Sequence, residues 1–356
     1  MKSTPPPQNT RVLVTGGCGF LGRQVVLQLL DEGATVAVVS RAPKPLEIDE
    51  RFKDKISYHA ADISSEPQIQ DIFTQIKPCA VIHTAALLLG HEAIELRRCN
   101  VNGTQILLRY AKECPETKAF VYTSTDSATV PTQEPLTEEN AQLYNESHFS
   151  NQYGLTKAIA DKMVTDANTG GSGLATAVLR VPVLYGEYDH PMVRRMMESI
   201  RKKEHKIQVG RNIKIFEFLY VKKAAEAHIL AFRALLDPST VSSIAGNAFF
   251  ISDEKPQPFF TFMRRCYAVA GHPVADKEVT VLPLSMMKTM ASVMEWAFWI
   301  FTFGTKEPSM RREDIDYLDR GSCWCLDKAK EKLGYEPIAD QDEAIKRTME
   351  WAAASL

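Results

Sequence analysis

Short apolar runs alternate with amphipathic segments along the first half of the chain. The apolar runs are rich in β-branched residues, as is typical of strands buried on both faces of a parallel sheet, and they cover 11–15, 34–40, 57–60, 80–83, 119–124 and 174–180. Helical spacing of apolar residues covers 23–30, 67–76, 94–112 and 151–166. This alternation predicts an α/β fold with a doubly wound parallel sheet, the Rossmann architecture. In such sheets the ligand binds beyond the carboxyl ends of the strands.

The first strand runs directly into a glycine-rich turn, so that 11–22 reads RVLVTGGCGFLG. Its glycines fit both G-x-x-G-x-x-G and G-x-G-x-x-G. Glycines at such positions allow a tight turn, a close backbone approach to a pyrophosphate and close packing of the next helix. The first N–H groups of that helix then bind the phosphates. The expected dinucleotide contacts in this turn are Gly16, Gly19, Phe20, Leu21 and Gly22. An ordinary glycine-rich turn is the alternative, which the strand–helix context disfavours.

The end of the second strand predicts which dinucleotide is bound. A fold that selects NAD places an Asp or Glu there for the ribose 2′-hydroxyl. This chain has Ser40 and Arg41 instead, and the next acid is Glu47. Ser and Arg can bind a 2′-phosphate that a carboxylate would repel. The sequence therefore favours NADP over NAD, with a solvated Arg41 as the alternative.

Candidate catalytic residues follow the fifth predicted strand. Tyr153 and Lys157 are four residues apart on a predicted helix, so their side chains share one face. We expect the ammonium to lower the pKa of the tyrosine, which is ~10 in free peptides. Tyr153 would then exchange a proton with the substrate while a hydride moves, Thr125 would bind the substrate oxygen, and Asn100 would tether a water beside Lys157. Taken alone, a Tyr-x-x-x-Lys pair usually lies on an exposed helix face.

Other strand ends add further candidates. The small residues Thr84, Ala85 and Ala86 follow the fourth strand, where a cofactor would lie. His83 is interpreted as a packed strand-end histidine. Asp126 is either an additional acid beside Thr125 or part of a structural turn.

In combination these pieces resemble the extended short-chain dehydrogenase/reductase family. The matching motifs are TGGCGFLG, Asp62-Ile63, VIHTAA, NVNGT, YTST, YGLTK and LRVPVLYGE, which lie in order over 11–186. The resemblance implies that Tyr153, Lys157, Thr125 and Asn100 form the catalytic tetrad. It also implies cofactor contacts for Asp62 and Ile63 at the adenine and for Tyr153, Lys157 and Pro182.

The second half resembles the 3β-hydroxysteroid dehydrogenase branch, which includes the decarboxylating sterol-4α-carboxylate 3-dehydrogenases. The matching segments are 216–232, 247–265 and 327–351. The resemblance implies interconversion of a ring hydroxyl and a ketone on a sterol or polycyclic terpenoid. Lys222-Lys223 departs from an acid-Asn pair, and we interpret it as a solvated helix start. The alternatives are a ketoreductase acting on a non-steroid natural product and a non-catalytic NADP-binding module.

An apolar segment near the C-terminus, 284–303, is bracketed by Pro283 and Gly304. Its polar residues form one narrow stripe. A membrane span is disfavoured, because Lys288 and Glu295 would each cost ~2.5–3.5 kcal/mol near a bilayer centre. An amphipathic helix in a membrane interface fits better, and a buried core helix or substrate lid is the alternative. The expected organisation is a disordered tail at 1–10, a dinucleotide-binding domain at 11–180 and 206–252, and a substrate lobe at 181–205 and 253–356.

Composition excludes other classes of function. The net charge is −2 and basic runs are lacking, which argues against nucleic acid as a partner. Seven cysteines without a secretion signal indicate reduced thiols in an intracellular protein. Cys323-Trp-Cys325 lacks the second ligand pair of a zinc site, so no metal is expected. The expected location is the cytoplasmic side, peripheral on an internal membrane such as the endoplasmic reticulum, and the expected protein partner is a second copy of the chain in a homodimer.

Overall fold

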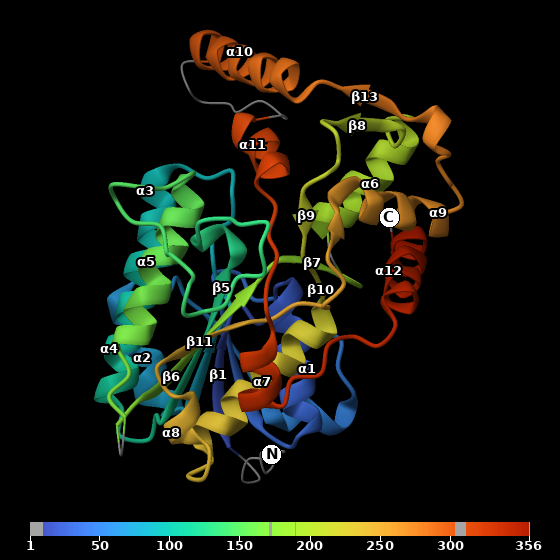
Figure 1. Cartoon of the computed structure of the whole chain (residues 1–356). Helices are drawn as coiled ribbons and strands as arrows, with labels where there is room; N and C mark the ends of the chain where they lie inside the picture. Colours follow the sequence, from blue (N-terminus) through green and yellow to red (C-terminus); the bar gives the residue numbers. More distant parts are fainter. Residues whose placement is uncertain (1–9, 171–172, 189, 303–310, 356) are drawn as a thin grey trace.

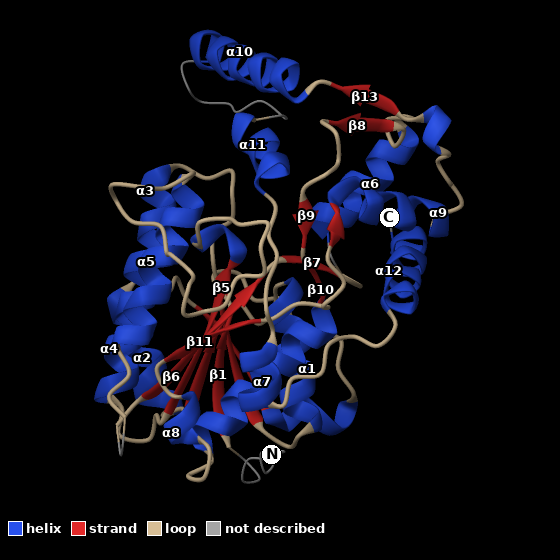
Figure 2. Cartoon of the chain, in the orientation of Figure 1, coloured by secondary structure: helices blue, strands red, loops and turns tan. Residues whose placement is uncertain are grey.

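A parallel seven-stranded sheet lies at the centre of the computed structural model, which describes residues 10–170, 173–188, 190–302 and 311–355 (Figures 1 and 2). The strand order is β11-β6-β5-β4-β1-β2-β3. The strands are β1 (Arg11–Thr15), β2 (Thr35–Ser40), β3 (Ile56–Ala60), β4 (Ala80–His83), β5 (Ala119–Thr125), β6 (Ala175–Val181) and β11 (Asn247–Phe250). The predicted fold class is confirmed.

Helices cover both faces of this sheet, as the apolar strands require. The helices are α1 (Phe20–Asp31), α2 (Glu66–Ile76), α3 (Ala93–Leu96), α4 (Thr104–Glu113), α5 (Gln152–Asp166), α7 (Val221–Leu236) and α8 (Val241–Ile244). Val12 and Val14 of β1 pack into a core shared with α1 and α7, whereas Leu13 between them packs into a core shared with α2 and α4. The interior residues of β1 are therefore buried on both faces of the sheet, which is why this strand is continuously apolar.

The helix predicted over 94–112 is interrupted. A π-helical segment, η2 (Arg97–Gly103), separates α3 from α4. Such wide turns are rare and often occur at functional sites. The apolar spacing over 94–112 predicted one continuous helix and did not reveal this π-helical segment.

A second group of elements lies beyond the carboxyl ends of the strands (Figure 1). Its helices are α6 (His190–Arg201), α9 (Phe259–Val269), α10 (Leu284–Thr302), α11 (Arg312–Arg320) and α12 (Gln341–Ser355). Three two-stranded sheets join β7 (Val183–Tyr185) to β10 (Phe218–Tyr220), β8 (Ile207–Val209) to β13 (Thr280–Leu282), and β9 (Ile215–Phe216) to β12 (Gln257–Pro258). Short helical turns complete the chain: η1 (Glu50–Lys55), η3 (Asp126–Ala128), η4 (Asp276–Glu278) and η5 (Ala329–Leu333).

Strands β8 and β9 lie within 206–252, a range predicted to belong to the dinucleotide-binding domain. Both strands pair with segments of the predicted substrate lobe. Strand partners lie more than forty residues away along the chain, so local sequence could not identify them. The division into two lobes stays a prediction.

Helix α10 turns its polar stripe towards α11 and its apolar face outward. Lys288 Nζ lies 2.9 Å from Asp316 and 3.2 Å from Asp319, both on α11. Glu295 accepts a 2.8 Å hydrogen bond from the Arg312 backbone N–H. Among the remaining side chains of the helix, those of Trp296, Trp299 and Phe301 are 69%, 66% and 82% exposed. The buried-core alternative is therefore wrong for the described part of α10; Phe303, also predicted in this helix, lies outside the described residues.

Among the described ranges, none of the helices is both long and apolar enough to cross a membrane.

Candidate active site

A cavity of about 700 Å³ opens at the carboxyl ends of the strands and collects most of the predicted site residues. Those that line it are Gly16, Gly19, Phe20, Leu21, Ser40, Arg41, Asp62, Ile63, Thr84, Ala85, Ala86, Thr125, Tyr153, Lys157 and Pro182. Gly22 and Asn100 are not among the described residues that line it. Residues far apart in sequence thus share one wall because parallel strands end at one edge of the sheet.

The glycine turn brings backbone against this cavity. Gly16 has a φ of +72°, a region that side chains disfavour, and a Cβ there would lie 2.8 Å from the Ala85 nitrogen. A Cβ on Gly22 would lie 2.1 Å from the Gly16 oxygen, so Gly22 permits close packing of α1 rather than contact with a ligand. Helix α1 begins after Gly19 without a side-chain cap. Its first N–H groups therefore remain available for an anion.

Positive charge surrounds the end of β2. Arg41, Lys44 and Arg98 all line the cavity. Arg98 Nη1 lies 3.1 Å from Asp62 Oδ2. Although burial opposes it, hydrogen bonds from Ser64 and the charges of Arg98 and Arg41 lower the pKa of Asp62 below its ordinary value. Sequence reasoning missed Lys44 and Arg98; Arg98 lies on the π-helical segment, and its position depends on that turn.

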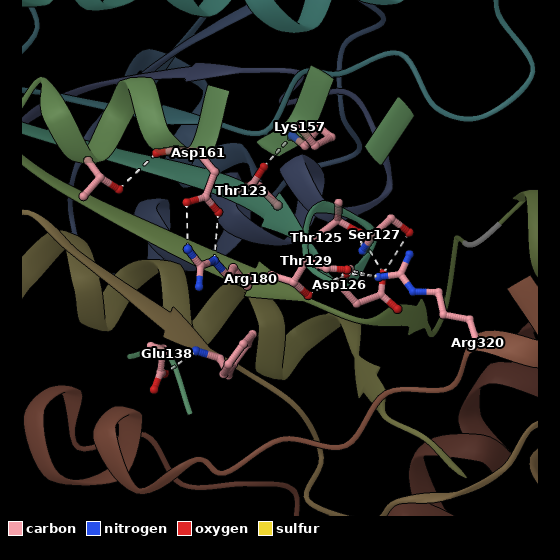
Figure 3. A network of polar contacts seen from close by, with 12 residues as sticks. Thr123, Thr125, Asp126, Ser127, Thr129, Glu138, Lys157, Asp161, Arg180 and Arg320 are labelled. Carbon is pink, nitrogen blue, oxygen red and sulfur yellow. Dashed lines mark hydrogen bonds and ion pairs between the residues drawn. The ribbon is translucent and has the colours of Figure 1, made fainter. Parts of the chain in front are cut away.

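Lys157 lines the cavity but is almost fully buried. Its Nζ donates a 2.6 Å hydrogen bond to the Thr123 carbonyl (Figure 3) and lies 4.3 Å from the centre of the Tyr122 ring. Burial lowers the pKa of Lys157 to about 7, against the opposing charge of Asp161. The ammonium is thus close to its midpoint of titration at neutral pH.

The structure does not lower the pKa of Tyr153, which was the expected effect of Lys157. The pKa of Tyr153 is raised, first by burial and then by the negative charge of Asp126, while a hydrogen bond with Thr125 works in the opposite direction. The prediction of a lowered tyrosine pKa was wrong, because helical spacing reports a shared face and not the burial or the charges across the cavity.

Thr125 is tied to its neighbour. Its hydroxyl donates a 3.0 Å hydrogen bond to Asp126 Oδ1 and accepts a 3.3 Å bond from the Ser127 N–H. Asp126 is only 4% exposed. Its other carboxylate oxygen accepts a 3.0 Å hydrogen bond from Tyr317 of α11. Asp126 is therefore a buried acid held against the candidate catalytic threonine.

The side chain of Asn100 is held by backbone and side-chain contacts. Its Oδ1 accepts a 2.8 Å bond from the Leu87 N–H, and its Nδ2 donates to the Leu87 carbonyl and to Thr156 at 3.0 and 3.2 Å. These contacts use both amide protons and one lone pair of Oδ1. Asn100 thus joins the loop after β4 to helix α5, and its role as a water tether stays a prediction.

His83 and the Lys222-Lys223 pair are structural. The ring nitrogens of His83 lie 2.6 Å from the Thr15 hydroxyl and 3.0 Å from that of Thr104. Burial, aided by Lys157, lowers the pKa of His83 to about 3, so it stays neutral. Lys222 and Lys223 lie in the first turn of α7 and pair with Glu187 at 2.9 Å and Glu226 at 2.7 Å.

Comparison with known proteins places this geometry in a family. The model of the 3-beta hydroxysteroid dehydrogenase/isomerase family matches residues 13–284. A decarboxylating sterol-4-alpha-carboxylate 3-dehydrogenase (ERG26) of Gibberella zeae is 53% identical over 292 residues, which are 81% of this chain and 96% of that relative. The Candida albicans enzyme of the same name is 30% identical, covering 97% of this chain and 98% of its own.

Among solved structures, dTDP-glucose 4,6-dehydratase from Bacillus anthracis, in complex with NAD, superposes with a TM-score of 0.71 over 97% of each chain at 18% identity. At that identity the likeness concerns the fold.

Proposed function

Because this chain belongs to the 3-beta hydroxysteroid dehydrogenase/isomerase family, we propose that it oxidises the 3-hydroxyl group of a sterol that carries a 4-carboxylate. Family membership makes it a nicotinamide-dependent dehydrogenase of the extended short-chain type, which acts on CH–OH groups. The observation that carries the finer proposal is that Tyr153, Lys157 and Thr125 line the same cavity as the glycine turn. The name of the Gibberella zeae relative, a sterol-4-alpha-carboxylate 3-dehydrogenase, supports the substrate class.

Tyr153, Lys157 and Thr125 each have one role in the proposed reaction. A nicotinamide dinucleotide, when bound, accepts a hydride from the carbon that bears the hydroxyl. Tyr153 exchanges the hydroxyl proton at its phenolic oxygen, as general acid–base residues do. Lys157 when protonated favours the phenolate. Thr125 binds the substrate oxygen.

Decarboxylation needs no further residue. Oxidation of a 3-hydroxyl beside a 4-carboxylate produces a β-keto acid. Such acids lose carbon dioxide readily, since the electron pair of the broken C–C bond passes into the adjacent carbonyl to form an enol. Proton return to carbon then gives the ketone.

We also infer that NADP(H) is the preferred cofactor. Ser40, Arg41, Lys44 and Arg98 line the cavity, and the one acid among the predicted contacts there, Asp62, lies within 3.1 Å of Arg98. This arrangement supports binding of a 2′-phosphate at the end of β2. Three cationic side chains and the Ser40 hydroxyl line the cavity there, and the Arg98 guanidinium compensates the negative charge of Asp62.

We further propose that α10 lies in a membrane interface. Its polar stripe is engaged by α11, whereas its exposed side is formed by Met286, Met290, Val293, Trp296, Trp299, Ile300 and Phe301. An apolar face with tryptophans is typical of interfacial helices. A sterol partitions into lipid, so an enzyme at the interface would receive it without a passage through water.

The central test is product analysis with Tyr153→Phe. The purified chain, given NADP⁺ or NAD⁺ and a 4-carboxysterol, should yield a 3-ketone that has lost carbon dioxide, as measured by mass spectrometry. Removing the phenolic hydroxyl should lower turnover by ~10²–10⁴-fold with cofactor binding retained. Tyr110→Phe, which removes a hydroxyl on α4 near Glu66, serves as the matched control and should retain full turnover. Turnover of Tyr153→Phe within tenfold of the parent would overturn the assignment.

A further inference from the structure

A second cavity of about 700 Å³ is formed by the elements beyond the carboxyl ends of the strands, and none of the described residues that line it also lines the first cavity. Its walls come from the loop after β8, from β9, and from parts of α9, α10 and α11. Phe216, Phe259 and Phe260 give it an aromatic surface, and Leu284 and Leu318 add aliphatic area. Cavities of ~300–1,000 Å³ with an apolar, aromatic lining are typical sites for small organic ligands. The proposed reaction assigns this cavity no role.

The charged side chains that line the second cavity favour an anion. Arg211 and Lys214 both lie on the loop between β8 and β9. Across the part of the chain that the structure describes, neither has an ion-pair partner. Asp319, the acid among the described lining residues, lies 3.2 Å from Lys288 of α10, which offsets its charge. The described lining therefore has a net positive charge, which attracts an anionic group.

Asn212 fixes the loop that carries the two cations. Its Oδ1 accepts a 2.9 Å hydrogen bond from the Phe260 N–H, and its Nδ2 donates a 3.1 Å bond to the Thr261 hydroxyl, both in the first turn of α9. The φ of Asn212 is +55°, a region in which Asn is enriched among non-glycine residues. The loop thus has a defined conformation, which keeps Arg211 and Lys214 at the cavity.

Contacts link the second cavity to both α10 and the end of β5. Leu284, which lines it, is the first residue of α10. Phe216 lines it as well, and the centre of its ring lies 5.3 Å from that of Tyr317. The Tyr317 hydroxyl in turn donates a 3.0 Å hydrogen bond to Asp126, which follows Thr125. In Figure 1, α11, which carries Tyr317, lies between α10 and the central sheet. The cavity is thus connected through α11 to the candidate catalytic threonine.

We propose that the second cavity binds a steroid carboxylic acid, with the rings against the phenylalanines and the carboxylate at Arg211 and Lys214. The inference rests on the proposed function for the choice of ligand, because a sterol with a 4-carboxylate combines a rigid apolar body with one negative charge. The cavity holds this acid between its arrival at α10 and its reaction at Tyr153. The decarboxylated ketone lacks the charge, so the second cavity binds the substrate in preference to the product.

Equilibrium dialysis measures binding of a soluble 3-hydroxysteroid with a 4-carboxylate to the full chain saturated with NADPH, which cannot accept a hydride. We expect two molecules per chain, one in each cavity. In the double variant Arg211→Gln, Lys214→Gln the dissociation constant of one of these sites should rise about tenfold or more, because hydrogen bonds between charged groups are the stronger kind. A parent that binds a single molecule, or a variant that binds both as tightly as the parent, would overturn the proposal.

The same steroid without its 4-carboxylate isolates the contribution of the charge. Its binding should not respond to the double variant, because it has no group for the two cations to bind. The matched control is Lys112→Gln, Lys162→Gln, which removes two exposed lysines on α4 and α5 and should leave both dissociation constants of the acid unchanged. Equal weakening of both steroids would show that the loop variant disturbs the shape of the cavity, and it would contradict the proposal.

Oleate tests the class of ligand. It has the negative charge without the rigid rings and loses more conformational freedom on binding, so it should displace the steroid acid only at clearly higher concentration. Displacement at equal concentration would show a site for any anionic amphiphile and would overturn the steroid assignment. A chain that binds two molecules of the acid but forms no ketone with NADP⁺ or NAD⁺ would count against the proposed function, while the second site would stand.

Discussion

At the scale of single residues, the choice between two cofactors depends on a few side chains at the end of β2. Ser40 and Arg41 line the cavity, and the nearby acid Asp62 is paired with Arg98 at 3.1 Å. An acid placed at residue 40 would repel a 2′-phosphate and offer a ribose hydroxyl an acceptor. Cofactor preference is therefore set by local charge and not by the fold, which serves either dinucleotide.

The corresponding variant is Ser40→Asp. We expect the ratio of kcat/KM for NADPH to that for NADH to fall by about tenfold or more, since hydrogen bonds to charged groups contribute ~1.5–3 kcal/mol. Ser239→Asp introduces the same charge after α7, on a loop remote from the glycine turn, and should leave the ratio unchanged. A parent that prefers NADH would show that Arg41 takes no part in phosphate binding.

At the scale of elements, α10 is attached to α11 partly through charged residues that an isolated amphipathic helix would turn to water. Lys288 and Glu295 contact α11, beside a small apolar cluster of Met287 and Ala291, while Trp296, Trp299 and Phe301 stay exposed. The same helix α11 carries Tyr317 and Arg320 to Asp126. The apolar face and the candidate catalytic threonine are thus connected through one short helix.

Replacing both Trp296 and Trp299 with Ser tests the interface. We expect the variant to lose flotation with liposomes, because the buried area of two indoles contributes several kcal/mol at ~25 cal/mol per Å². Its melting temperature should stay close to the parental value, since both side chains are mostly exposed. Ile94→Ser, an exposed apolar side chain on α3, is the matched control and should still float. A parent that never floats with lipid removes the membrane proposal.

At the scale of the whole molecule, burial of the Lys157 ammonium in the cavity wall lowers the stability of the protein. The pKa of Lys157 is about 7 in the fold and 10.5 as the reference value. Between these values the unfolded chain binds more protons than the native protein, so the free energy of unfolding contributed by this group rises with pH. Below pH 7 both states are protonated, and the full penalty for burying the charge remains.

Lys157→Met should therefore unfold at higher urea concentration than the parent at pH 6, and the difference should shrink steadily towards pH 9. Urea titrations of the cofactor-free proteins at several pH values measure it. Lys162→Met serves as the control, because Lys162 is an exposed partner of Asp166 in an i,i+4 pair. A difference between Lys157→Met and the parent that stays constant over this range would show that Lys157 titrates normally.

The sequence by itself determined the elements and the place where they meet. The apolar runs predicted β1 to β6 within two residues of their ends, because strands of a sheet covered on both faces are rich in consecutive apolar residues. The glycine spacing predicted the tight turn, in which Gly16 adopts a φ of +72°. Since parallel strands end at one edge, these local features also predicted which residues gather at the cavity.

Tertiary structure alone decided how those residues are engaged. Asn100 is bound by Leu87 and Thr156, and Thr125 is held by an acid that Tyr317 fixes from almost two hundred residues away. The raised pKa of Tyr153, the partners of β8 and β9, and the outward face of α10 likewise depend on groups distant in sequence. Periodicity records which face of an element is apolar, but charge, hydrogen bonding and burial at a site arise from the neighbours that folding brings to it.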